Sequence, residues 1–233
     1  MILLTARLLL AGAVALSTAC LAQAVLLVPP WCMDTDGRPA ALSADHRWIL
    51  AADTAEQSLT LYDDKLKIVR QYPLAGLDGP PRVAALTIVD APPRNSFIVV
   101  LHATPEIWEI SYDPNAAPIF DGLVHDYRMG EGLARPGFLG IRRTLLRTPL
   151  TEPAFTADYS TVIGLARHTG SGGVQARIVN LDVRRELGTA TLASSPEHDA
   201  SFAVTANGRT WHANRSRAAA TESTQRLMRY CTP

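Results

Sequence analysis

The chain has 233 residues, with 22 basic and 22 acidic side chains, so its formal net charge at pH 7 is zero. A neutral chain without runs of like charge lacks the electrostatic footprint of a protein that binds nucleic acid or an anionic membrane surface. Hydrophobic residues make up 47 % of the sequence, which at this length is enough for the core of one ordinary domain.

The first segment, residues 1–24, has the features of a secretory signal peptide. One cation, Arg7, precedes an apolar run over 8–16, and the small-residue motif Ala-Gln-Ala follows at 22–24. A short positive region, an apolar core of about 7–15 residues and such a motif are typical of exported proteins. We therefore expect cleavage after Ala24 and a periplasmic location. Because the apolar run is shorter than the roughly 20 residues of a spanning helix, no membrane span is expected after cleavage.

Three cysteines bear on the same compartment. Cys20 lies within the leader, and the alternative to cleavage after Ala24 is a lipoprotein whose N-terminus is a lipid-modified Cys20. Cys32 and Cys231 lie near opposite ends of the mature chain, and neither belongs to a zinc or c-type haem motif. In an oxidising compartment this pair predicts a disulfide, which would stabilise the fold by roughly 5 kcal/mol through chain entropy. Two free thiols are the alternative.

Beyond the leader, the chain consists of short apolar runs separated by Pro, Gly, Asp and Asn. Runs of about 4–8 residues rich in Val, Ile, Leu and aromatic residues predict β-strands. In chain order they are 48–52, 59–62, 83–89, 97–101, 107–110, 162–166 and 176–181. No window sustains the spacing of a long amphipathic helix. We therefore expect residues 25–233 to form a single all-β domain.

A repeat is visible within this domain. Residues 42–50 align with residues 155–163, and two weaker copies share the pattern of a turn residue before an apolar strand. The turn residues of the four copies are Asp45, Asn95, Asp158 and Asn207. Their spacing of roughly 50–60 residues is close to the ~40–50 residues of a propeller blade. The sequence thus predicts a partial β-propeller of about four blades, each a four-stranded antiparallel sheet, with a poorly formed last blade.

The alignment of the two stronger copies extends to the end of a later strand, where Asp63 is matched with Asp182. This match requires an insertion, which we place in the Gly-rich segment 168–173. A long connection over 112–143 carries many apolar side chains, too many for a disordered segment. We expect this connection to be packed at one face of the propeller.

Several segments resemble, in the same order, parts of the propeller of the cytochrome cd1 nitrite reductase family, which includes a related periplasmic propeller protein of haem d1 biosynthesis. The segments are 81–86, 97–100, 109–113, 155–158 and 201–204. The resemblance covers roughly residues 42–215 and implies an eight-bladed propeller whose central face holds haem d1. It therefore implies haem d1 or a related tetrapyrrole as the cofactor, although this chain has only about half of the blades.

The chain departs from that family where nitrite is bound. The resemblance implies two distal histidines, but at the place of the first the chain reads Thr151-Glu152-Pro153-Ala154, and His198 is one place displaced from the second. The blades that would supply a proximal ligand and a c-type haem motif are also missing. The departures favour a non-catalytic or accessory role, in which the protein binds a tetrapyrrole or a partner protein. An active oxidoreductase of the nitrite reductase or haem d1 biosynthesis type is the alternative.

Two residues are candidates for contact with a tetrapyrrole. Arg82 precedes an apolar strand near the expected rim, where its guanidinium group could hold a propionate through two hydrogen bonds. A structural ion pair is the alternative for Arg82. His198 is the second candidate, and its role comes from the resemblance. The six histidines show no metal-ligand spacing, and no nucleophile motif is present, so neither a metal site nor a catalytic residue is predicted.

An open arc of blades would expose apolar faces and strand edges, which proteins normally cover. We therefore expect the blades either to close into a small ring or to associate with another chain. A homodimer that completes an eight-bladed ring is the simplest such assembly.

Overall fold

The computed structural model describes residues 39–53, 55–76, 86–120, 134–167, 173–194, 196 and 201–215. In these residues the chain forms β-strands and one short 3-10 turn, η2, over Pro92–Arg94. The strands form two four-stranded sheets and one six-stranded sheet. The prediction of an all-β fold is confirmed. Within the described part, no helix is long and apolar enough to cross a membrane.

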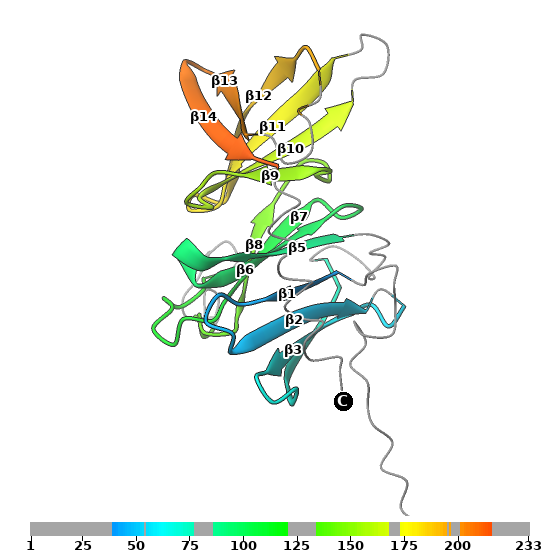
Figure 1. Cartoon of the computed structure of the whole chain (residues 1–233), viewed down its shortest axis with the longest axis vertical. Helices are drawn as coiled ribbons and strands as arrows, with labels where there is room; N and C mark the ends of the chain where they lie inside the picture. Colours follow the sequence, from blue (N-terminus) through cyan, green and yellow to red (C-terminus); the bar gives the residue numbers. More distant parts are fainter. Residues whose placement is uncertain are drawn as a thin grey trace, which may run out of the picture.

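The first two sheets are complete blades, in which each strand pairs with the next strand along the chain. Blade 1 contains β1 (Ala40–Leu42), β2 (Trp48–Asp53), β3 (Ser58–Asp63) and β4 (Ile68–Pro73). Blade 2 contains β5 (Leu86–Ala91), β6 (Ser96–Leu101), β7 (Glu106–Ser111) and β8 (Ile141–Leu145). Figure 1 shows blade 2 stacked on blade 1.

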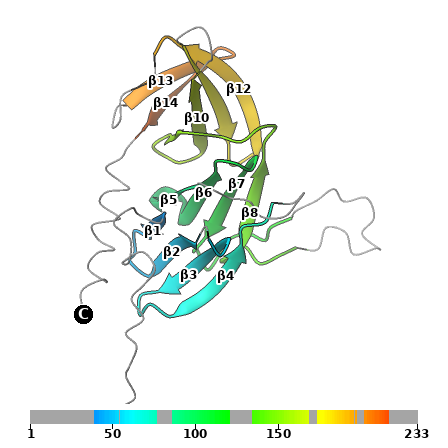
Figure 2. The same cartoon turned by 90° about the vertical axis from the view of Figure 1, so that its right-hand side faces the viewer.

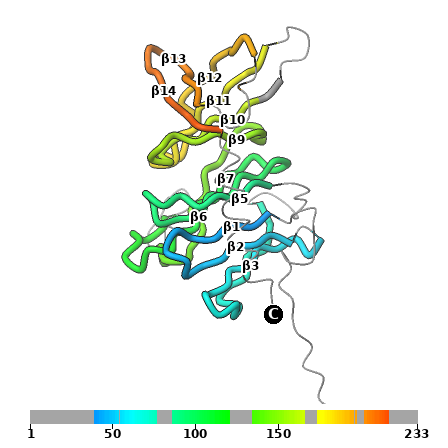
Figure 3. The backbone as a smooth tube through the Cα atoms, in the orientation of Figure 1, coloured from blue at the N-terminus to red at the C-terminus, as the bar shows by residue number. Residues whose placement is uncertain are grey.

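The third sheet contains blade 3 and a further hairpin. Blade 3 is formed by β9 (Pro153–Phe155), β10 (Thr161–Arg167), β11 (Val174–Asn180) and β12 (Arg185–Leu192). The hairpin of β13 (Ser201–Ala206) and β14 (Arg209–Asn214) joins this sheet through a single pair, Asn214 with Phe155. Three blades and half of a fourth agree with the prediction of about four blades and a poorly formed last one. The trace in Figure 3 runs up this stack from blue to orange.

The blades pack face to face, and three apolar clusters lie between the successive layers. Trp108 and Phe97 are fully buried between blades 1 and 2, and Val162 and Val179 pack against Ile98 between blades 2 and 3. The faces of blade 3 and the hairpin meet around Trp211. Because both faces of a middle blade are covered, its strands read as continuous apolar runs rather than as alternating ones.

The repeated turns are built in the same way in blades 1 and 3. Ser43 Oγ donates to Asp45 Oδ1 (2.6 Å) and accepts from the backbone N–H of Trp48 (3.0 Å). In blade 3, Thr156 Oγ1 donates to Asp158 Oδ1 (2.6 Å) and accepts from the backbone of the first residue of β10 (3.1 Å). Such side-chain bonds to the local backbone are the reason why Ser, Thr and Asp favour turns. The predicted turn positions are therefore confirmed.

The second half of the repeat alignment is wrong by two residues. Asp63 pairs with Trp48 across the sheet, and the corresponding partner of Thr161 is Asn180 rather than Asp182. Asn180 also has the turn chemistry of Asp63, because each side chain accepts the backbone N–H two residues further along, at 3.1 and 2.9 Å. The alignment matched two aspartates, whereas the fold needs only a side-chain carbonyl oxygen, which Asn also supplies.

Each blade has two ends, which we name by their connections. The turn end carries the first hairpin turn of each blade, such as β1–β2 and β5–β6. The connection end is the opposite one, where the chain passes from the last strand of a blade to the first strand of the next. Figure 2 shows the innermost strands β1 and β5 on one side of the stack and the outermost strands β4, β8 and β12 on the other.

Candidate functional site

The residues that the sequence singled out lie outside the described part of the chain. These are Arg82, His198, Cys32 and Cys231, together with Cys20 and the leader. The predicted disulfide, the signal peptide and the two tetrapyrrole contacts therefore remain predictions. The described residues on either side of Arg82 and His198 are informative, however, because all of them belong to the connection end of the blades.

An ion pair between a carboxylate and a guanidinium group contacts Pro196, two residues before His198 in the sequence. Arg215, which follows β14, forms an ion pair of 2.6 Å with Glu152 and donates a hydrogen bond of 3.0 Å to the carbonyl oxygen of Pro196. Glu152 directly precedes β9, and Pro196 follows β12. The structure thus brings together the two segments at which the resemblance expects distal histidines, and it places Glu152 and Arg215 between them.

The backbone at Glu152 is unusual. Its φ angle is 46°, in the left-handed region that residues other than Gly, Asn and Asp seldom adopt. The preceding residue is held firmly, because Thr151 Oγ1 donates to the carbonyl oxygen of Leu165 and the Leu165 amide donates back to Thr151, each at 3.0 Å. Strained backbone of this kind costs about 1–3 kcal/mol and persists only where surrounding contacts impose it. The backbone position of Glu152 is therefore set by the fold, and its exposed carboxylate is held by the ion pair with Arg215.

A second charged cluster contacts the segment that follows β4, on the N-terminal side of Arg82. Glu106, at the start of β7, is almost fully buried and accepts hydrogen bonds from Trp108 Nε1 (2.7 Å) and from Arg143. The guanidinium group of Arg143 also stacks on the Trp108 ring, 4.4 Å from its centroid, and donates to the carbonyl oxygen of Ala75 (3.1 Å). Buried charges are retained where they are paired and hydrogen-bonded in this way. The cluster anchors the chain as it leaves blade 1.

His102 is the third polar group at this end. It follows β6, and its Nε2 is 2.9 Å from the hydroxyl oxygen of Thr87, on the innermost strand of blade 2. Burial lowers the pKa of His102 below the usual value, so the imidazole is neutral at pH 7. A neutral, half-buried imidazole suits a structural hydrogen bond or a proton-transfer role. Sequence reasoning found no signal for His102, because its partner is fifteen residues away on another strand.

A half-buried acid lies at the opposite, turn end. Asp90, near the end of β5, accepts a hydrogen bond of 2.8 Å from the hydroxyl group of Tyr112. Burial raises the pKa of the Asp90 carboxyl to about 6, despite this bond. The pKa of Tyr159 is also raised, first by burial and then by the Asp90 charge. Asp90 was not identified from the sequence, although an acid within the apolar run 86–91 was a usable signal.

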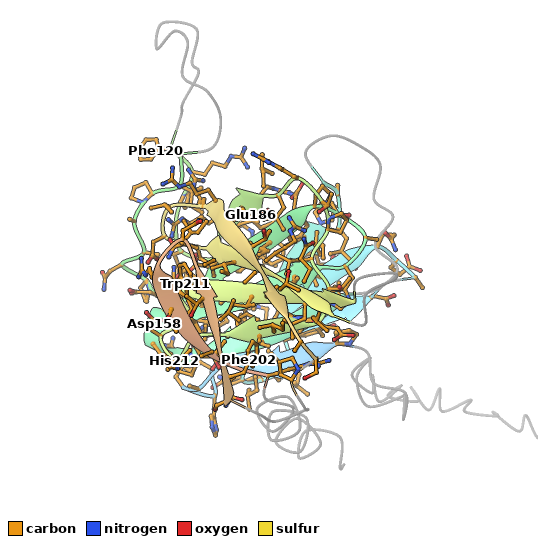
Figure 4. All side chains as sticks on the ribbon, turned by 90° about the horizontal axis from the view of Figure 1, so that it is seen from above. Phe120, Asp158, Glu186, Phe202, Trp211 and His212 are labelled. Atoms are coloured by element: carbon orange, nitrogen blue, oxygen red, sulfur yellow. The ribbon has the colours of Figure 1, made fainter. Side chains whose placement is uncertain are left out.

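Two hollows are found in the described residues, one at the turn end and one on the outer rim. The first, of about 590 Å³, is lined by Arg94, Glu109, Arg142 and Asp182, and by the connection after β7. Its charges are mutually paired: Arg94 binds Glu109 and Asp182, each at 2.8 Å, and Arg142 binds Glu109 at 3.3 Å. This network links blade 2 to blade 3, which indicates a structural role. Phe120, also on its wall, lies at the periphery of the molecule in Figure 4.

The second hollow, of about 670 Å³, lies on the outer rim between β8 and β12. In the described residues, no group of three or more His, Cys, Asp or Glu side chains could hold a metal ion. The described residues therefore offer polar and charged contacts at the connection end, among them the imidazole of His102, and two hollows elsewhere on the arc.

Comparison with known proteins agrees with this architecture. The family described as "Cytochrome D1 heme domain" matches residues 32–120. A solved structure of "Dihydro-heme d1 dehydrogenase NirN in complex with DHE" is 25 % identical, covers 75 % of this chain and has a TM-score of 0.51. The match covers 32 % of that chain, so this chain spans about a third of the length of its solved relative. The β-propeller domain of Myceliophteria thermophila Cps50 (Swd1) is 11 % identical over 76 % of this chain and 52 % of that one, with a TM-score of 0.42. No curated protein matches the chain.

Antiparallel four-stranded blades that pack face to face define the chain as a β-propeller protein. The family model matches the part of the chain that holds blade 1 and the first three strands of blade 2, and the structural match covers three quarters of the chain. The chain is therefore similar to the cytochrome cd1/haem d1 propeller family, as the sequence resemblance predicted.

Proposed function

We propose that this protein is an exported, accessory member of the haem d1 propeller family that binds a d1-type tetrapyrrole or a protein partner at its connection end and does not reduce nitrite by itself. The observation that carries the proposal is the pairing of Glu152 with Arg215 at the place where the resemblance expects a distal histidine. Haem d1, when bound, would supply the redox-active iron.

The chemistry of the pair supports a non-catalytic role. Nitrite reduction needs groups that deliver protons to the bound anion, and the loss of one positioned acid–base group typically costs 10²- to 10⁴-fold in rate. Glu152 points its carboxylate at a guanidinium group, which carries no transferable proton at neutral pH.

Binding needs less than catalysis. A propionate-bearing ring requires cations near its edge and an apolar surface beneath it, and we assign these contacts to Arg82 and His198. The clusters around Glu106 and Arg215 support this assignment. The first holds the backbone at Ala75, before Arg82, and the second holds the backbone at Pro196, before His198. Export, with cleavage after Ala24, and a disulfide between Cys32 and Cys231 complete the proposal.

The test uses the purified mature protein. Haem d1 is titrated into it while the Soret band is followed, and nitrite turnover is then assayed with an artificial electron donor. We expect a saturable spectral shift that is weakened by Arg82→Ala but not by Arg47→Ala, which changes an exposed arginine of blade 1. Turnover near that of a nitrite reductase would overturn the accessory role, and the absence of a shift at high micromolar haem d1 would overturn tetrapyrrole binding.

A second candidate function is favoured by the structural match. The matched protein is described as a dihydro-haem d1 dehydrogenase, so this chain is a candidate for the oxidation of a dihydro-tetrapyrrole. Because the chain spans about a third of that protein, the reaction would require a further chain or domain. Incubation with dihydro-haem d1 and an artificial electron acceptor distinguishes the two candidates, since only the dehydrogenase converts the spectrum to that of haem d1.

The assembly that would complete the ring is also a proposal. Three blades and a hairpin form an arc rather than a closed ring in the described residues, and we propose that a second copy completes it. Light scattering on the mature protein decides this point, because a stable monomer would exclude the homodimer.

A further inference from the structure

The outer rim of the arc carries a groove, one wall of which is formed by the residues at the end of β8. It runs between the end of β8 and the first part of β12, and its volume is about 670 Å³. Its lining residues are Leu145, Leu146, Arg147, Arg185, Glu186, Leu187, Gly188 and Thr189. The tetrapyrrole candidates are not among them, so the groove can be tested independently of the proposed function.

Two cations in this groove are not used by the fold. Among the described residues, neither Arg147 nor Arg185 has an ion pair or a side-chain hydrogen bond, and both are exposed. The single acid of the groove, Glu186, is already paired with Arg177 at 2.7 Å. The groove therefore has an uncompensated positive charge, whereas the hollow around Arg94 has its charges paired. This charge is complementary to an acidic ligand.

The groove also has an apolar part. Leu145 exposes 53 % of its surface, although it ends a strand whose preceding residue is buried. Leu187 is half-buried and packs against the apolar cluster around Trp211, and the space beside Gly188 is taken by Asn207. An apolar side chain of a ligand would therefore find its contact at Leu145, two residues from Arg147.

The backbone of β12 is the third element. With eight residues it is the longest strand described, and in the described residues β11 is the one strand that pairs with it, so its other edge has no strand partner. One backbone group of β12 is already bonded, because Asn207 Nδ2 donates to the carbonyl oxygen of Leu187 at 3.1 Å. An open edge presents a row of N–H and C=O groups to which an extended peptide can add as a further strand. Figure 4 looks down on the hairpin that carries Phe202 and Trp211, and it labels Glu186 on β12.

From these three features we infer that the β12 edge is a docking site for an extended acidic segment of a partner protein. The segment adds to β12 as an extra strand, its carboxylates meet Arg147 and Arg185, and an apolar side chain between them contacts Leu145. Because alternate residues of a strand share one face, the expected pattern is acidic, any residue, apolar, any residue, acidic.

The test measures fluorescence anisotropy with the full mature chain and a labelled peptide containing Glu-Thr-Leu-Thr-Glu. We expect saturable binding that weakens as salt is raised and falls about tenfold or more in the double variant Arg147→Glu/Arg185→Glu. The matched control is Arg47→Glu, an exposed arginine of blade 1 that lies over the Trp48 ring, and it should bind normally. Circular dichroism verifies that each variant folds.

Two further peptides test how the segment binds. A peptide with N-methyl groups on alternate backbone amides should lose binding, because it cannot pair with a strand edge. A peptide in which Lys replaces both Glu residues should not bind. Equal binding of the wild-type and doubly substituted proteins, retained binding of the N-methylated peptide, or full displacement by millimolar inorganic phosphate would each overturn the inference.

Discussion

The hydroxyl group of Tyr112 donates a hydrogen bond of 2.8 Å to Asp90, across the turn end of blade 2. It joins the residue after β7 to the innermost strand of the same blade. The carboxyl group is nevertheless buried enough for its pKa to be raised to about 6, and nearby Asp45 contributes to the same direction. The folded protein therefore binds the Asp90 proton more tightly than the unfolded chain does.

This relationship predicts a pH dependence of stability. Between about pH 4 and pH 6 the unfolded chain loses the Asp90 proton while the folded protein retains it, so stability falls as the pH rises through this window. Asp90→Asn, which keeps an acceptor for Tyr112, should remove the dependence and stabilise the protein above pH 6 by about 1–3 kcal/mol. Urea unfolding at several pH values measures both effects.

Asp158→Asn is the matched control for that experiment. Hydrogen bonds, first from Thr156, lower the pKa of Asp158, so its contribution is present at neutral pH and is lost as the pH falls. This variant should therefore be destabilised at neutral pH and approach the wild type in acid. Parallel behaviour of the two variants would contradict the assignment of Asp90.

The repeated turns allow a second prediction. Ser43→Ala and Thr156→Ala each remove a side chain that accepts the backbone N–H of the following strand and donates to an aspartate. Each should reduce the free energy of unfolding by about 1 kcal/mol. Thr156→Ser keeps the hydroxyl group and should recover most of the loss. Guanidinium unfolding measures the series, and an unchanged midpoint in both alanine variants would show that the turns are held in another way.

The charge network between blades 2 and 3 gives a third prediction. Arg94 exposes 14 % of its side chain and binds both Glu109 and Asp182, whereas Arg142 exposes 34 %. Arg94→Ala should destabilise the protein by about 2–4 kcal/mol, because it leaves Glu109 with a single weaker partner. Arg142→Ala should cost less than about 1 kcal/mol. Thermal unfolding of the two variants in parallel is the measurement, and the reverse order would contradict the assignment of Arg94 as the main link.

Gly164 gives a fourth prediction. A Cβ atom at this position of β10 would lie 1.4 Å from Leu150 Cδ2, which belongs to a fully buried side chain. Gly164→Ala should therefore destabilise the protein by about 2 kcal/mol or more, as overpacked cores do. Adding Leu150→Ala creates room, so the double variant should be less destabilised than the sum of the two single changes. Additive effects in urea unfolding would argue against this contact.

The sequence was sufficient for the features that depend on neighbouring residues. The strands could be predicted because they are short apolar runs between turn residues, and the four turn positions because Ser, Thr, Asp and Asn bind their own local backbone. The register between Thr161 and Asn180 was missed, because the alignment sought an identical residue rather than an equivalent oxygen atom.

Other parts of the candidate site could not be predicted from the sequence. Glu152 and Arg215 are separated by 63 residues, and their meeting depends on how the hairpin joins the third sheet. The partnership of Arg94 with Asp182 likewise depends on the way in which two blades pack. The sequence shows that such residues can form ion pairs, but the partner of each residue depends on how the blades pack.

The face-to-face stack has a consequence for how the protein opens. Each layer contacts only its neighbours, so its cooperativity is close to one-dimensional, as in repeat proteins. All six residues of β6 are buried, and blade 2 is covered on both faces. Amide hydrogen exchange should therefore be slowest in β6 and β7 and faster in β4 and in the terminal hairpin, because local unfolding begins where the fewest contacts are lost. Blade 2, in the middle of the arc, is thus the most stable part of the fold. Blade 1 and the terminal hairpin, at the two ends of the stack, are the parts that can change conformation when a partner binds.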